Sequence, residues 1–248
     1  MLPVSPIERK SLSDAVFEQL RQRIVGGDFA PDTPLPAERR LCEMLGVNRQ
    51  ALREALKRLQ QAGLVSVQHG GQTKVVDFRE HAGLDLLPSL LFGAEGTFDA
   101  QVARGIIEMR GAIAEDAARL AAERADAATR KALLELVDAM KAAGDDLPKR
   151  QRQAMEFWRL VIIGSGNVAY RLAYNTLMRT YEQLAGLLTQ VLSPEFTQLA
   201  AFREVAKAIH AKDGAAAERA TRKVLNRGTE ELFKLLDELE QSAPRGHR

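Results

Sequence analysis

The chain has 248 residues, 46% of them apolar and 27% charged, which is enough for two domains with buried cores, and its formal charge of only +2 does not by itself indicate a nucleic-acid partner. The single cysteine, Cys42, excludes an intrachain disulfide and a thiolate metal cluster and is typical of a reducing compartment. No segment approaches the ~18 consecutive apolar residues of a membrane span, and the N-terminal residues lack the apolar run of a secretion signal, so we expect a cytoplasmic protein without a membrane partner.

Three helices are predicted in the first quarter of the chain. From Ser13, apolar residues recur at three- and four-residue spacings, so a first helix should end near the glycine pair at 26–27. A loop rich in Pro and Asp follows, and a second helix should begin at Pro36, because the first helical residue needs no N–H. After a turn at Gly46, a third helix should begin at Asn48, whose side-chain oxygen can cap it.

A hairpin is predicted directly after the third helix. Its strands are Leu64 to Val67 and Thr73 to Val76, and the turn HGGQ between them has two glycines that supply free backbone angles. Two short helices joined by a tight turn and followed by a hairpin form the pattern of a winged helix-turn-helix. This pattern makes DNA the first partner to consider.

Positive charge gathers in this motif. Between Arg39 and Lys74 there are seven basic residues and two acidic ones. The start of the third helix carries side chains that can bond base edges, namely Asn48, Arg49, Gln50 and Arg53. The tip of the hairpin is small and polar, which suits close approach to a groove, and consists of His69, Gly70 and Gly71 with Lys74 just behind. A solvated helix face and an ordinary exposed turn are the alternatives for these two groups.

Helical patterns without a further strand signal occupy the rest of the chain. They run over about 84–91, 98–124, 127–143, 148–163, 167–192, 194–211 and 215–239. We therefore predict a DNA-binding domain at 8–78, a linker at 79–84, an all-helical effector-binding and dimerisation domain at 85–240, and a polar tail at 241–248. The expected fold class is mainly α, with a winged helix-turn-helix of three helices plus a β-hairpin joined to an all-α bundle.

Several stretches of the chain resemble transcription regulators of the GntR family. They are LPAER at 35–39, GVNRQALREAL at 46–56, LQQAGLVSVQHG at 59–70 and TKV at 73–75. The helical half is similar to the FadR branch of that family and, within it, to the acyl-CoA-responsive regulators of fatty acid metabolism. It shares with them GLDLL at 83–87 and, within 165–184, an SGN, an Asn and two Tyr at matching positions. The resemblance spans the chain and is strong over about residues 16–90.

This resemblance implies roles in DNA binding for individual residues. It makes Arg39, Arg49 and Arg53 the base and phosphate contacts, places Asn48, Gln50 and Ala51 along the groove edge, and lets His69 and Gly70 enter the minor groove. Ala51 and Gly71 depart from the related regulators, which have a hydroxyl residue and a lysine there, so the operator should differ in detail. The expected partner is a palindromic double-stranded DNA operator, and the expected state is a homodimer.

Many members of the FadR branch hold a metal ion through one Asp and three His on facing helices. The matching positions here carry apolar side chains, which are Ala154, Trp158, Phe202 and Val224. Such a set cannot bind a divalent cation and can only fill or line an apolar cavity. We therefore expect neither a metal nor another cofactor.

Four residues of the helical domain are predicted to meet an effector, namely Arg110, Trp158, Asn175 and Tyr181. For Arg110, Asn175 and Tyr181, internal hydrogen bonding is an equally open alternative. The resemblance implies a fatty acyl-CoA as the effector. The alternative is a small organic acid or sugar acid, bound without metal, whose carboxylate pairs with Arg110.

Two other classes of protein fit the sequence less well than a regulator. An enzyme would need a nucleophile or a paired acid and base, and four scattered His with one helix-borne Cys do not supply that arrangement. An architectural DNA protein would need a helical domain packed solidly without a ligand. The sequence favours a ligand-responsive DNA-binding transcription regulator that is not an enzyme.

Overall fold

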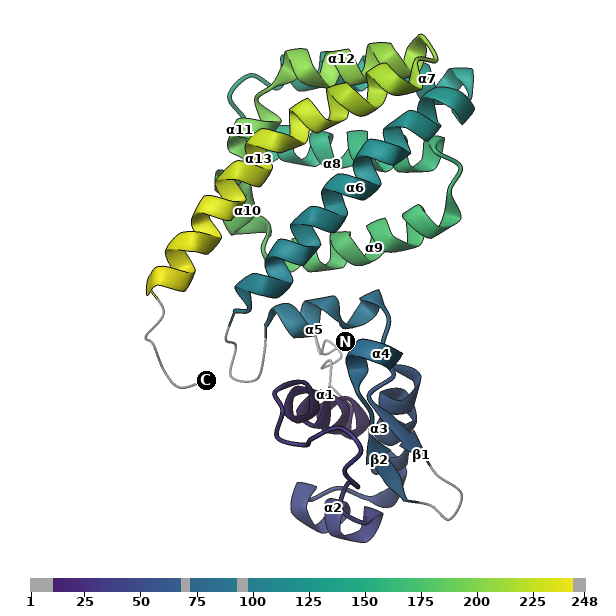
Figure 1. Cartoon of the computed structure of the whole chain (residues 1–248), viewed down its shortest axis with the longest axis vertical. Coiled ribbons are helices and arrows are strands. Elements are labelled where there is room, and N and C mark those ends of the chain that lie inside the picture. The colour runs from purple at the N-terminus through teal and green to yellow at the C-terminus, as the bar shows by residue number, and fades with distance from the viewer. Residues whose placement is uncertain (1–10, 68–71, 93–97, 243–248) are drawn as a thin grey trace, which may run out of the picture. The chain divides into compact units, whose positions relative to one another are not determined.

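The computed structural model describes residues 11–67, 72–92 and 98–242, and the chain forms two compact units with their sequence boundary between Asp99 and Ala100 (Figure 1). The first unit contains α1 (Leu12–Val25), α2 (Glu38–Leu45), α3 (Arg49–Gln61), β1 (Val65–Val67), β2 (Thr73–Val75), α4 (Phe78–His81), the 3₁₀ helix η1 (Leu84–Leu86) and α5 (Leu87–Leu91). The second contains α6 (Ala100–Arg124), α7 (Ala127–Ala142), α8 (Leu147–Gly164), α9 (Val168–Gln183), α10 (Ala185–Val191), α11 (Ser193–Phe196), α12 (Leu199–His210) and α13 (Gly214–Ser242). In the part of the chain that the structure describes, no helix is long and apolar enough to cross a membrane.

The helix-turn-helix follows from short-range signals. Gly46 ends α2 in the left-handed conformation, with φ of 65°, which a glycine adopts without steric cost. The prediction that α2 begins at Pro36 was wrong, because the helix begins at Glu38. The backbone N–H of Leu35 donates to the Thr73 carbonyl at 2.8 Å, and this bond keeps the chain extended just before the helix.

The three helices and the hairpin share one hydrophobic core. Leu20 of α1, Leu52 and Leu59 of α3, and Leu64 before β1 are almost completely buried in it. Burial of each such side chain contributes about 1.5–3 kcal/mol. This core fixes the angle at which α3 is presented by the unit.

The wing is tied to the loop that precedes α2. Strands β1 and β2 are antiparallel, with Val65 opposite Val75 and Val67 opposite Thr73. On the other edge of β2, the N–H of Val75 donates to the Thr33 carbonyl at 2.9 Å. The Pro- and Asp-rich segment, which the sequence predicts to be a plain loop, therefore extends the hairpin sheet by a short pairing.

The first unit reaches further along the chain than the predicted linker at 79–84. Leu86 lies in the core of the helix-turn-helix, and Phe78 and Leu90 pack against that core. Residues 85–99, which we assigned to the effector domain, therefore belong to the DNA-binding unit. Their short apolar helices resemble the start of a helical bundle in sequence, but the surface that they bury is on the first unit.

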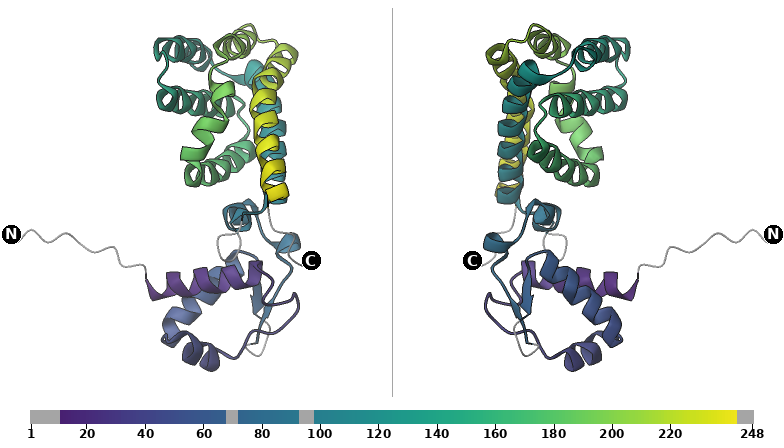
Figure 2. Two further views of the ribbon diagram at one scale, coloured as in Figure 1. Left: turned by 90° about the vertical axis from the view of Figure 1, so that its left-hand side faces the viewer. Right: turned by 90° about the vertical axis from the view of Figure 1, so that its right-hand side faces the viewer.

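The second unit is an all-helical bundle, as the sequence predicts. Its two longest helices, α6 and α13, lie side by side, as both Figure 1 and Figure 2 show. Helix α12 packs against α13 and α7, and α8 packs against α6 and α7. Phe157, Phe202 and Ile209 are fully buried between these helices. The predicted fold class, mainly α with a winged helix-turn-helix and an all-α domain, is confirmed.

Two predicted helices are each divided in the structure. The predicted helix at 167–192 becomes α9 and α10, because Leu184 leaves the helical conformation and its N–H bonds the Tyr181 carbonyl three residues back. The predicted helix at 194–211 becomes α11 and α12, with Gln198 at φ −80° and ψ 57° between them. Helix α13 continues to Ser242, two residues into the predicted tail at 241–248.

Candidate nucleic-acid interface and effector region

The start of α3 presents a compact set of polar side chains. The Asn48 side chain caps the helix by accepting a hydrogen bond from the backbone N–H of Ala51 at 2.8 Å. Arg49, Gln50 and Arg53, in the first two turns of the helix, are exposed. Because the Asn48 side-chain cap fixes where this turn begins, these exposed side chains leave a defined end of the helix.

Two of the predicted DNA-contacting arginines are paired with carboxylates of α2. The Arg53 Nε donates to Glu38 at 3.0 Å across the helix-turn-helix, and Arg39 lies 3.8 Å from Glu43 on its own helix. Both guanidinium groups remain largely exposed, at 69% and 83% of the side chain. Exposed pairs of this kind are weak, so a DNA phosphate or base edge can replace the carboxylate.

The predicted groove contact Ala51 differs from its neighbours. It is only 6% exposed, since its methyl group points into the unit while its N–H serves the Asn48 cap. Its side chain therefore offers little surface to a groove, and a DNA contact at Ala51 stays a prediction. Lys74 is half-buried in β2 opposite Ser66, while His69, Gly70 and Gly71 fall outside the described residues.

Arg58, one of the basic residues of the motif, has a structural role. Its guanidinium bonds Asp14 of α1 at 2.5 Å and lies over the Phe17 ring, 4.3 Å from the centroid. Hydrogen bonds from Ser11 and Arg58 lower the pKa of the Asp14 carboxyl. The contact holds α1 against α3, so part of the local positive charge supports the fold rather than DNA binding.

In the second unit, the four positions that carry metal ligands in many FadR-branch regulators lie in an apolar interior. Ala154, Phe202 and Val224 are completely buried and Trp158 is 6% exposed. The Trp158 and Phe202 rings lie 5.8 Å apart, and Phe157 packs edge-on against both. Among the described residues, no group of three His, Cys, Asp or Glu could hold a metal ion. The donor set at these positions does not fit a metal.

Arg110 has an internal partner that the sequence did not reveal. Its Nη2 donates to both carboxylate oxygens of Glu195 in α11, at 2.5 and 2.6 Å. Burial raises the pKa of Glu195 above its ordinary value, while the Arg110 guanidinium and the Trp158 indole act in the opposite direction. In the segment SPEF, Glu195 has the sequence context of an exposed first-turn acid, so no local signal marks it as buried.

Tyr181 also bonds within the protein. Its hydroxyl accepts a hydrogen bond from the Gln151 side chain, whose Oε1 accepts one from the Thr189 hydroxyl at 2.6 Å. Burial raises the Tyr181 pKa. Asn175, by contrast, is exposed on α9. The structure therefore brings Arg110 and Trp158 together at Glu195, hydrogen-bonds Tyr181 to Gln151, and exposes Asn175 to solvent.

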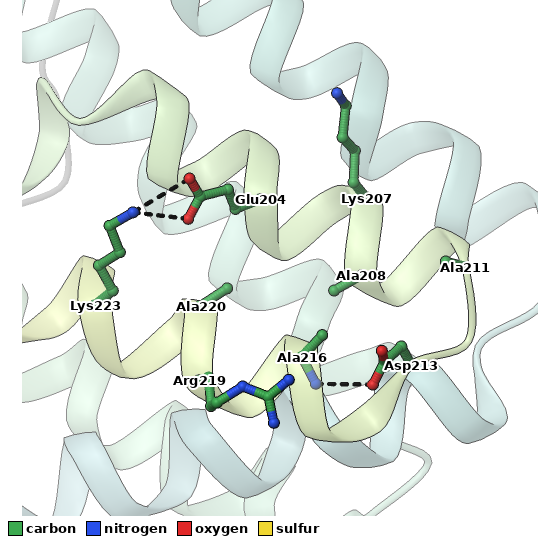
Figure 3. Close-up of a pocket in the computed structure, with 9 residues that line it drawn as sticks. All are labelled: Glu204, Lys207, Ala208, Ala211, Asp213, Ala216, Arg219, Ala220 and Lys223. Atoms are coloured by element: carbon green, nitrogen blue, oxygen red, sulfur yellow. Dashed lines mark hydrogen bonds and ion pairs between the residues drawn. The ribbon is translucent and has the colours of Figure 1, made fainter.

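A separate groove of 540 Å³ lies on the surface between α12 and α13 (Figure 3). Its charged groups are partly engaged, because Lys223 pairs with Glu204 at 3.0 Å and Asp213 accepts the Ala216 N–H at 2.8 Å. The remaining lining residues are Lys207, Ala208, Ala211, Arg219 and Ala220. None of the predicted effector contacts lies in this groove.

Two family models match the chain, one in each unit. The model of bacterial regulatory proteins of the gntR family matches residues 12–75, and the FCD domain matches residues 105–227. The HTH-type transcriptional regulator Mce2R of Mycobacterium tuberculosis is 38% identical over 235 residues, which cover 95% of this chain and 97% of Mce2R. The match therefore extends over both the winged helix-turn-helix and the helical domain.

Two further relatives agree with part of this picture. The fatty acid metabolism regulator protein of Vibrio cholerae is 41% identical over 102 residues, which cover 41% of this chain and 35% of that protein. The solved structure of Lar from Listeria monocytogenes shares the fold, with a TM-score of 0.53 and 17% identity over 92% of this chain and all of Lar. These relatives are regulators rather than enzymes. The chain belongs to the gntR family of bacterial DNA-binding transcription regulators and carries an FCD effector domain.

Proposed function

We propose that the chain is a homodimeric, cytoplasmic regulator that binds a palindromic operator through α3 and changes its DNA affinity when the helical domain binds a fatty acyl-CoA. The observation that carries the DNA-binding part is the side-chain-capped start of α3, where Arg49, Gln50 and Arg53 are exposed together. Arg can contact guanine through two hydrogen bonds, and Asn or Gln can do so with adenine. This end of α3 is therefore suited to base recognition.

Dimerisation is proposed from the small size of the interface that one unit offers. A single unit contributes few phosphate contacts, and each such contact adds a similar increment to affinity. Two copies double the contacts and the length of sequence recognised, which makes the operator palindromic. Regulation then requires only that the effector bind one arrangement of the dimer more tightly than the other.

The acyl-CoA proposal is supported by the apolar interior of the second unit and by the partial likeness to the Vibrio fatty acid metabolism regulator. The four positions that would hold a metal in related domains carry Ala154, Trp158, Phe202 and Val224, all buried. The apolar acyl group of an acyl-CoA suits such surroundings better than a hydrated small acid does. The likeness to the Vibrio protein covers 102 residues only, so it supports the DNA-binding unit more directly than the effector domain.

A small organic acid is the second candidate effector, and Arg110 is the observation that favours it. Its side chain is 24% exposed, so the carboxylate of a ligand can reach the guanidinium if it displaces the Glu195 carboxylate. Titration calorimetry with the intact protein compares palmitoyl-CoA, free CoA, citrate and gluconate. If palmitoyl-CoA is the one ligand of the four that gives saturable heat, the acyl-CoA effector is supported. If citrate or gluconate gives saturable heat and palmitoyl-CoA does not, the small-acid effector is supported.

The operator is found by selecting bound duplexes from a randomised pool and is then tested by fluorescence anisotropy at fixed salt. We expect a palindromic consensus bound at least a thousandfold more tightly than a scrambled duplex, within the range of about 10³–10⁷ usual for specific DNA binding. A selection that returns no consensus would contradict the proposed DNA-reading role of α3. Adding palmitoyl-CoA to the same complex measures the direction of regulation.

A further inference from the structure

The ion pair between Arg110 and Glu195 is enclosed by four helices of the effector domain. Glu195 is completely buried on α11, and both of its carboxylate oxygens accept hydrogen bonds from Arg110 of α6. Buried ion pairs can often be replaced by apolar side chains without loss of stability. A pair of this kind therefore calls for a reason beyond holding the helices together.

The surroundings of the Glu195 carboxylate are shaped to hold an anion of this size. Gly228 of α13 faces it, and a Cβ added at Gly228 would overlap the Oε2 atom. The indole Nε1 of Trp158, on α8, is buried without a normal hydrogen bond among the described residues and helps to lower the pKa of Glu195. The Arg110 guanidinium, the Trp158 indole N–H and the space beside Gly228 thus surround the Glu195 carboxylate.

We infer that Arg110, Trp158 and Gly228 form a carboxylate-binding site whose built-in occupant is Glu195. The inference rests on the proposed function, because it assigns this site to the effector domain of a ligand-responsive regulator. A free carboxylate enters the site only by displacing Glu195. Since α11 has four residues, displacement of Glu195 moves the whole helix, which packs against α13 and α8.

The site predicts how the intact protein responds to simple acids. With Glu195 in place, sodium acetate should leave the thermal midpoint no higher than sodium chloride does at the same ionic strength. In Glu195→Ala the midpoint should fall, because the Arg110 guanidinium loses its carboxylate and a cavity opens. Acetate should then bind in the vacated space and restore at least half of the loss, as a ligand that binds only the folded state must.

Two control variants separate this site from general effects of acetate. Glu204→Ala removes a surface carboxylate that pairs with Lys223 in the same domain, and its midpoint should be equal in acetate and chloride. The double variant Arg110→Met/Glu195→Ala should likewise show no difference between the two salts, because the guanidinium is gone. Equal midpoints in acetate and chloride for Glu195→Ala, or an acetate effect of the same size in either control, would overturn the inference.

If Glu195→Ala is recovered only as insoluble protein, its refolding yield from urea is compared in acetate and in chloride. A higher yield in acetate supports the site, and equal yields overturn it. Palmitoyl-CoA calorimetry and operator anisotropy on the wild-type chain test the proposed function separately. If palmitoyl-CoA and the operator both fail to bind but acetate still rescues Glu195→Ala, the acyl-CoA regulator is contradicted and the carboxylate site is not. If palmitoyl-CoA and the operator both bind but acetate does not rescue Glu195→Ala, the carboxylate site is contradicted and the regulator is not.

Discussion

Arg49 is the residue at which a single substitution should most affect sequence recognition. It lies exposed in the first turn of α3 and, unlike Arg39 and Arg53, has no ion-pair partner among the described residues. Arg49→Ala should weaken operator binding by about 1–3 kcal/mol, which is about five- to 150-fold, and leave binding to a scrambled duplex nearly unchanged. Anisotropy titrations of both duplexes at one salt concentration measure this difference.

Lys57→Ala is the matched control for Arg49→Ala. Lys57 is also basic and exposed and lies about two turns further along the same helix. A loss of charge alone should weaken binding to both duplexes equally and lower the salt slope by at most about 1. If Arg49→Ala behaves in this way too, Arg49 is a phosphate contact and not a base contact.

Asn48 should contribute to stability independently of DNA. Its side chain accepts the Ala51 N–H at 2.8 Å, so Asn48→Ala leaves that donor without its cap and should cost about 1 kcal/mol of unfolding free energy. Asn48→Asp keeps an acceptor at the same position and should cost much less. Urea unfolding of the three proteins in the absence of DNA distinguishes these results, and equal losses in the two variants would rule out capping as the cause.

At the level of helices and strands, the sequence predicts those boundaries that depend on neighbouring residues. The turn at Gly46, the cap at Asn48 and the hairpin between 65 and 75 are all encoded within a few residues and were found correctly. At the division at Leu184 the nearest break signal is Gly186, which lies inside α10, so the local pattern does not mark the division itself. Assignment of residues 85–99 to the first unit depends on where Leu86 is buried, which is a tertiary property.

Two glycines with the same backbone conformation provide a test of how the first unit is packed. Gly46 and Gly63 have φ of 65° and 69°. A Cβ at Gly46 would meet nothing within 4 Å, whereas one at Gly63 would lie 2.5 Å from the backbone carbonyl oxygen of His81. Alanine at Gly46 therefore adds only the strain of a left-handed residue, about 1–2 kcal/mol.

Alanine at Gly63 adds the same strain and a clash with backbone that cannot rotate away. Gly63→Ala should therefore lower the unfolding free energy by at least about 1 kcal/mol more than Gly46→Ala does, in line with the usual cost of overpacking. Urea titrations followed by circular dichroism compare the two. Equal losses would show that α4 does not pack over the turn between α3 and β1.

Across the whole chain, the two candidate sites differed in how far the sequence could locate them. The DNA-binding residues lie within one contiguous motif, so their grouping follows from local spacing. Arg110 and Glu195 are separated by 85 residues, and nothing near either one marks the pairing. Asn175 belongs to a stretch that resembles related regulators, yet it is exposed, whereas Trp158 is buried. Long-range pairing of single polar side chains is a product of packing and cannot be read from spacing.

The dimer proposal makes a prediction for the complete molecule on DNA. Three duplexes of equal length are compared, carrying the full palindrome, one half-site with the other scrambled, and neither half-site. If two copies bind together, scrambling one half-site should weaken binding more than about a hundredfold, because each mismatched base pair costs about 1–3 kcal/mol. A single copy per site would bind the first two duplexes almost equally.

Native mass spectrometry of the same complexes gives the stoichiometry directly. We expect two chains on the full palindrome, and a salt dependence of affinity steeper than that of a single unit because twice as many phosphates are contacted. Arg49→Ala, which should spare dimerisation, serves as the control that separates loss of base contacts from loss of assembly. One chain per duplex, with equal affinity for the palindrome and the half-site, would contradict a dimeric regulator and leave each helix-turn-helix to act alone.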